Sequence, residues 1–211
     1  MTRRTADHRF DDLPDDVPWP PRGAAMGEAI TALAHAGRRR LLDELTLNGP
    51  APVGALARAT GMAAGSASHH LRVLARAGFI VAAPELAGDT RQSWWRATRR
   101  TLRWSDDAFA PGSAGWELGQ LAGRANLDYL LDAARRWQRS PDQAGWDGTV
   151  SDVLTQATQN QCADLGTRLA EVISQWAREC AQDQELHPDH ERRPVRAVAL
   201  TFPETVPDDR P

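Results

Sequence analysis

Residues 61–79 read GMAAGSASHHLRVLARAGF, and this stretch decides the fold of the N-terminal half of the chain. Apolar Ala67, Leu71 and Leu74 recur at intervals of four and three residues, which predicts an amphipathic helix with one buried face. The opposite face carries short hydrogen-bonding side chains near its start and arginines further along. This layout suits a helix whose first turns enter a DNA major groove while its arginines reach phosphates.

The residues around this stretch extend the prediction. Three shorter helices are expected before it, over residues 24–35, 38–47 and 52–60, because apolar residues recur at helical spacing between glycine and proline breaks. A short turn joins the last of them to the helix at 61–79, so the pair predicts a helix-turn-helix unit. Residues 80–83 and 92–97 are rich in β-branched and aromatic residues and flank a Gly-Asp turn, which predicts a β-hairpin, here called the wing.

Nine residues are expected to contact DNA: Ser66, Ser68, His69, His70, Arg72, Arg76, Arg91, Arg38 and Arg39. The two serines and His69 are interpreted as base readers, and Arg72 and Arg76 as phosphate contacts beyond the first turns. For His70, a DNA contact and packing at the edge of the core both remain open. Arg91 lies near the tip of the wing, where a minor groove or a phosphate is within its reach.

Arg38 and Arg39 belong to a run of three arginines at the start of a predicted helix. Positive charge is unfavourable at that end of the helix dipole, which is a reason to look for an outside anion. A solvated basic turn is the alternative interpretation.

Charge is divided unevenly along the chain. The whole chain has 25 basic residues, all arginine, and 28 acidic residues, a net charge of −3 at pH 7. Residues 22–103 contain 12 Arg and 5 acidic residues, whereas residues 104–211 contain 10 Arg and 18 acidic residues. The first segment is suited to meet a polyanion, and the second would be repelled by one.

Five motifs together resemble those of ArsR-type winged-helix transcriptional regulators. They are LAHAGRRRLL at 33–42, VGALA at 53–57, SHHLRVL at 68–74, AGFI at 77–80 and WWR at 94–96. The resemblance covers residues 24–98, and the acidic segment is similar, more weakly, to the C-terminal extension of some bacterial members. The resemblance to ArsR-type regulators implies a homodimer that binds operators of two-fold symmetry. Metal-sensing members place paired cysteines on the first helix of the helix-turn-helix, and residues 52–60 contain none.

The acidic segment is expected to form a helical dimerisation module. Amphipathic helices are predicted over 114–137 and 156–182, and short strands over 149–154 and 195–202 are expected to pair with each other. Two long apolar stripes can bury each other and a second subunit. Five tryptophans either line a pocket for a small apolar effector or fill the core and the interface: Trp104, Trp116, Trp137, Trp146 and Trp176.

Neither a disulfide nor a metal site is predicted. Cys162 and Cys180 are 18 residues apart on one expected helix, about 27 Å at about 1.5 Å per residue, so they cannot share a bond or an ion within one chain. A polar group near the C-terminus is interpreted as a solvated turn because its spacing is loose: His187, Asp189, His190 and Glu191.

The sequence therefore predicts a mainly α protein with a small β component. A flexible arm over 1–22 precedes a winged helix-turn-helix domain over 23–103, and residues 104–211 form the helical module with its short two-stranded sheet. No signal peptide, membrane anchor, cofactor or catalytic group is expected, and the location is expected to be cytoplasmic. The predicted function is a homodimeric DNA-binding transcriptional regulator, with repression the expected direction. A protein-binding adaptor and a small-molecule sensor remain the alternatives.

Overall fold

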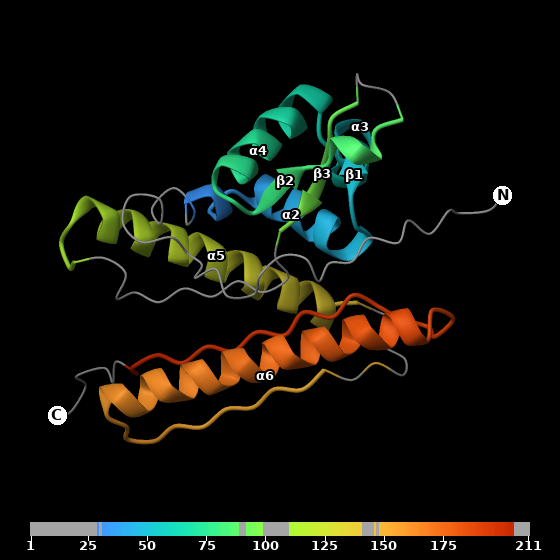
Figure 1. The fold of residues 1–211 in the computed structure, drawn as a ribbon. Helices are drawn as coiled ribbons and strands as arrows, with labels where there is room; N and C mark the ends of the chain where they lie inside the picture. Colours follow the sequence, from blue (N-terminus) through green and yellow to red (C-terminus); the bar gives the residue numbers. More distant parts are fainter. Residues whose placement is uncertain are drawn as a thin grey trace. The chain divides into compact units, whose positions relative to one another are not determined.

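The structure is a computed structural model that describes residues 29, 31–88, 92–98, 110–140, 146 and 148–204 (Figure 1). The expected arm at 1–22, half of the helix expected at 24–35, and Arg91 lie outside the described residues. The chain divides into two compact units, Met1–Tyr129 and Leu130–Pro211. Each unit is described by itself.

In the described part of the first unit, three helices lie between residues 36 and 76: α2 at Ala36–Asn48, α3 at Val53–Thr60 and α4 at Ala64–Arg76. All three were predicted from sequence, but α2 begins before Gly37, which had been expected to break the chain between helices. His35 is the N-cap of α2, and its Nδ1 accepts a hydrogen bond of 3.0 Å from the backbone N–H of Gly37. A Cβ at position 37 would lie 2.9 Å from the Met62 side chain. Gly37 therefore lies inside α2, and the break between the helices falls before it, at Ala34 and His35.

A three-stranded antiparallel sheet completes this unit, with the strand order β1-β3-β2. Strand β2 at Ile80–Ala82 and β3 at Trp94–Ala97 form the predicted wing, with Val81 opposite Arg96. Strand β1 at Ala51–Pro52 pairs with the other edge of β3 and was not predicted. A two-residue strand that ends in proline is too short to show a periodic pattern in the sequence. Strand β1 can therefore be recognised only from its pairing with β3.

The core of the first unit lies where α2, α3 and α4 meet the sheet. Its largest fully buried side chains come from all three helices and from the start of β2: Leu41, Leu45, Leu56, Leu71, Leu74, Phe79 and Ile80. The buried face of α4 consists of Ala67, Leu71 and Leu74, as its spacing predicted. Burying this face fixes the rotation of α4 and leaves the opposite face in solvent.

Two long helices follow: α5 at Ala114–Gln138, which crosses the division between the units, and α6 at Gln159–Leu186. Both were predicted. Helix α6 starts three residues later than expected because Thr158 and Gln161 form a capping box at its N-terminus. Among the described helices, none is both long enough and apolar enough to cross a bilayer.

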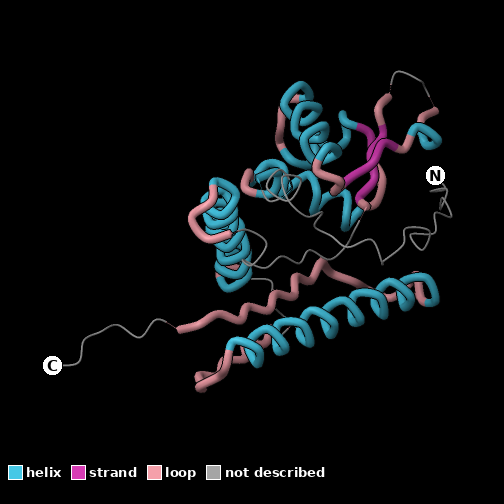
Figure 2. Tube along the Cα trace, turned by 60° about the vertical axis from the view of Figure 1, so that its left-hand side comes forward, coloured by secondary structure: helices cyan, strands magenta, loops and turns pink. Residues whose placement is uncertain are grey.

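The short strands predicted at 149–154 and 195–202 were wrong. Both segments lie outside any helix or strand, and the described part of residues 140–204 contains no strand. Instead, residues 191–204 run back along α6 in both views (Figures 1 and 2), and a Cβ at Gly166 would lie 3.1 Å from the Thr201 hydroxyl. Strand propensity acts only where a neighbouring strand completes the hydrogen bonds, and here the neighbour is a helix.

Candidate nucleic-acid interface

One face of α4 presents a polar stripe to solvent. Ser66, His69, Arg72 and Arg76 are all exposed, and their spacings of three, three and four residues place them on one side of the helix. The buried face of α4 points the other way, into the core. The stripe can therefore meet a partner without disturbing the packing of the domain.

The turn before α4 positions the start of this stripe. Helix α3 ends at Gly61 in the left-handed conformation (φ 68°), which glycine adopts without the steric cost that other residues meet. The N–H of Met62 then donates to the Ala57 carbonyl at 2.9 Å, which closes the turn. Ala63 is the N-cap of α4 and supplies no side-chain acceptor. The first N–H groups of α4 are thus uncapped by a side chain, an arrangement that suits a phosphate.

Ser68 and His70 lie on the two flanks of the stripe and are half-buried. The His70 ring packs 4.5 Å from the His35 ring and 5.6 Å from the His69 ring, measured between centroids. Its Nδ1 is buried and has no hydrogen-bond partner among the described residues. This placement favours the packing interpretation of His70 over a DNA contact.

Two of the arginines expected at DNA are used inside the protein. The Arg38 guanidinium donates from Nη2 to the Thr31 carbonyl at 2.8 Å and from Nε to the Ala32 carbonyl, at the end of the preceding helical residues. Arg39 is 4% exposed, and its guanidinium lies 5.1 Å from the centre of the Tyr129 ring. These contacts give each guanidinium a partner within the protein, so the structure does not support the two arginines as phosphate contacts, and their role in DNA binding stays a prediction.

Contacts made by α5 explain why the environment of Arg39 could not be predicted from the sequence. Tyr129 lies over Arg39 and donates from its hydroxyl to Asp43 Oδ2 at 2.8 Å. The tyrosine is 86 residues away from Asp43 along the chain, and no local pattern links them.

In the described part of the wing, Arg96 forms an ion pair of 3.3 Å with Glu85.

Comparison with known proteins agrees with this geometry. Residues 33–81 match a family described as a helix-turn-helix domain. The matched range contains α2, α3 and α4 and ends within β2. No curated protein matches the chain. With the hairpin of β2 and β3 added, residues 33–97 form a winged helix-turn-helix domain, and DNA is the partner that this class of domain binds.

His70 is expected to make the stability of this domain depend on pH. Burial, and then the positive charge of His35, Arg38 and His69, lowers the pKa of His70 below its ordinary value of 6.5. The unfolded chain therefore takes up a proton at His70 more readily than the folded chain does, so the free energy of unfolding falls as the pH drops through about 6.5. Urea unfolding between about pH 7.5 and about pH 5 should show this loss, and His70→Gln should reduce it.

The control for this prediction is His69→Gln, which removes an exposed imidazole from the adjacent position. It should keep most of the wild-type pH dependence. If His70→Gln and the wild-type chain lose stability equally on acidification, the environment described for His70 is not the cause.

Proposed function

We propose that this chain is a sequence-specific transcriptional regulator of the ArsR type that inserts α4 into the DNA major groove. The observation that supports it most strongly is the exposed polar stripe of Ser66, His69, Arg72 and Arg76 on a helix whose other face is fully buried. Because any amphipathic surface helix exposes polar residues, the support comes from the place of this stripe on the second helix of a helix-turn-helix, directly before the wing.

The position of each residue along α4 suggests its role. Ser66 and His69 lie in the first two turns of α4, where helix-turn-helix proteins contact base edges. Ser68 lies beside them, on one flank of the polar stripe. Arg72 and Arg76 lie further along and are proposed to hold phosphates. The uncapped N-terminus of α4 supplies a further phosphate contact. Arg91 at the wing stays in the proposal, whereas Arg38 and Arg39 are left out because the protein itself engages them.

A homodimer is part of the proposal. Several large apolar side chains of α5 and α6 are at least one-third exposed: Leu118, Leu121, Leu127, Leu131, Trp137, Leu165, Val172 and Trp176. A second copy of the chain would remove this surface from water and would place two α4 helices on an operator of two-fold symmetry. Repression is proposed on the resemblance to ArsR-type regulators alone.

Salt dependence of DNA binding tests the proposal. In a gel-shift assay with the region upstream of its own coding sequence, affinity should fall on the order of 10⁴-fold between about 50 and about 200 mM salt, as expected for about four phosphate contacts from each subunit of the dimer. Random DNA of equal length should bind more weakly at both salt concentrations. If neither DNA binds at the lower concentration, the chain acts through another partner, and a protein-binding adaptor becomes the better description.

A further inference from the structure

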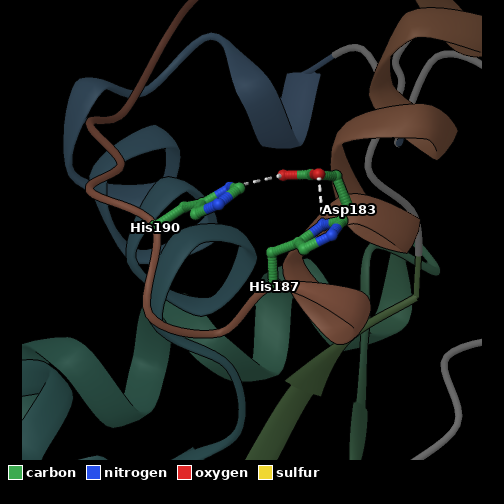
Figure 3. A group of neighbouring side chains, drawn as sticks. All are labelled: Asp183, His187 and His190. Atoms are coloured by element: carbon green, nitrogen blue, oxygen red, sulfur yellow. Dashed lines mark hydrogen bonds and ion pairs between the residues drawn. The ribbon is translucent and has the colours of Figure 1, made fainter.

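Asp183, His187 and His190 lie together at the C-terminal end of α6 and are called here the Asp183 cluster (Figure 3). Nδ1 of His187 lies 2.8 Å from Asp183 Oδ1, and Nδ1 of His190 lies 3.9 Å from Asp183 Oδ2. One potential ligand atom from each residue lies within 4.8 Å of the other two, and all three residues are exposed. The cluster thus presents two imidazoles and one carboxylate around a space that is open to water.

Sequence inspection chose the wrong acidic residues for this group. It placed His187 and His190 with their chain neighbours Asp189 and Glu191, whereas the carboxylate that faces both rings is Asp183, one helical turn before His187. The end of α6 at Leu186 and the turn that follows bring His190 back over the helix, where its ring stacks on that of His187 at 4.7 Å. The argument against a metal site relied on the loose spacing of these residues along the sequence. That argument does not apply to Asp183, His187 and His190, which the fold brings together.

The distances suit a small transition-metal ion. Zinc binds imidazole nitrogen and carboxylate oxygen at about 2.0–2.2 Å, so two ligands in a tetrahedral site lie about 3.3 Å apart. One ligand atom from each of the three residues lies within 4.8 Å of the other two, so small side-chain rotations bring them to this separation. His190 lies on an exposed turn, where rotation of its side chain closes the remaining gap. The C-terminal end of a helix also carries partial negative charge, which favours a cation.

Arg192 is the competitor that such an ion would meet. Its Nη2 donates to Asp183 Oδ2 at 2.6 Å and to the Asp183 carbonyl at 3.0 Å. The pKa of Asp183 lies below its usual value because Arg192, and then His187, hydrogen-bond the carboxylate. A cation at the Asp183 cluster must therefore share the Asp183 carboxylate with the Arg192 guanidinium or displace it.

We propose that Asp183, His187 and His190 bind one divalent transition-metal ion of the zinc class, and that Arg192 opposes the ion by competing for Asp183. Two imidazoles and one carboxylate are ligands that zinc accepts, with water in the remaining position. The proposal does not depend on DNA binding. The alternative is that the same residues only hydrogen-bond the C-terminal end of α6. Metal binding distinguishes the proposal from that alternative.

Zinc titration of the full chain tests the proposal, with a chromophoric chelator of micromolar affinity as competitor. The wild-type chain should bind one zinc ion per chain. Asp183→Asn and His187→Ala should each weaken binding at least about tenfold, because each removes a ligand. Arg192→Ala should tighten binding, since it frees the Asp183 carboxylate. Zinc should also raise the Tm of the wild-type chain and not that of Asp183→Asn.

Two controls separate this site from other zinc ligands. Asp189→Asn changes a carboxylate in the same turn but outside the Asp183 cluster, and it should bind zinc as the wild-type chain does. The double variant Cys162→Ser, Cys180→Ser should also retain binding. The proposal is overturned if the wild-type chain binds no zinc, if Asp183→Asn matches Asp189→Asn, or if the cysteine variant loses the ion. A loss of affinity in Arg192→Ala would overturn the role given to Arg192.

Discussion

Replacing Arg72 and Arg76 together by alanine is expected to weaken binding to operator and random DNA alike, by on the order of a hundredfold at moderate salt. Both side chains are exposed on the same face of α4 and lie beyond the turns proposed to contact bases. A phosphate contact carries no sequence information, so its loss should not change the preference for the operator. The plot of log affinity against log salt should become less steep by about 3.6, because the dimer loses two contacts in each subunit.

Gel shifts on both DNAs at several salt concentrations measure these changes. Arg168→Ala is the matched control for lost positive charge, because Arg168 pairs with Asp164 on α6 at 3.0 Å, within the acidic part of the chain. It should leave binding nearly unchanged. His69→Ala should differ from the arginine variant by reducing operator binding more than random binding. A selective loss at the operator in the double arginine variant would contradict the role of these arginines as phosphate contacts.

Leu71→Ala is expected to destabilise the winged helix-turn-helix domain by about 2–5 kcal/mol. Leu71 is fully buried at the centre of the α4 face that packs against the core, and alanine would leave a cavity there. A domain of ordinary stability loses much of its folded population at the upper end of this range. Urea unfolding followed by circular dichroism measures the change, and DNA affinity should fall with the folded fraction.

Leu47→Ala is the matched control for this substitution. Leu47 lies on α2 in the same unit, and its side chain is 52% exposed. The change should stay within about 0.5 kcal/mol of the wild-type chain. If both variants lose the same stability, the burial of Leu71 does not hold α4 in place.

Local patterns were sufficient for the elements that carry the DNA-binding proposal. The spacing of Ala67, Leu71 and Leu74 predicted both the helix and its buried face, and Gly61 marked the turn before it. The wing could be predicted because two strands flank a short connection and pair with each other. In each case the residues that decide the structure lie within a few positions of one another along the chain.

Patterns failed wherever a partner lay elsewhere in the chain. Strand β1 exists because β3 supplies its hydrogen bonds, and Arg39 is buried because Tyr129 lies over it. The segment 195–202 has the composition of a strand, yet it lies within the stretch that follows α6 and forms no ladder. In the Asp183 cluster, the end of a helix brings together residues that do not share a motif.

The amino-acid sequence alone therefore determined that a helix-turn-helix with a wing forms, and which face of α4 meets solvent. The periodicity of apolar residues is enough for that, because burial of one face dictates the exposure of the other. Only the tertiary structure decided which polar residues remain free to meet a ligand. Whether Arg39 faces a phosphate or a tyrosine, and whether Asp183 or Asp189 faces the two histidines, depends on packing between residues that local spacing does not relate.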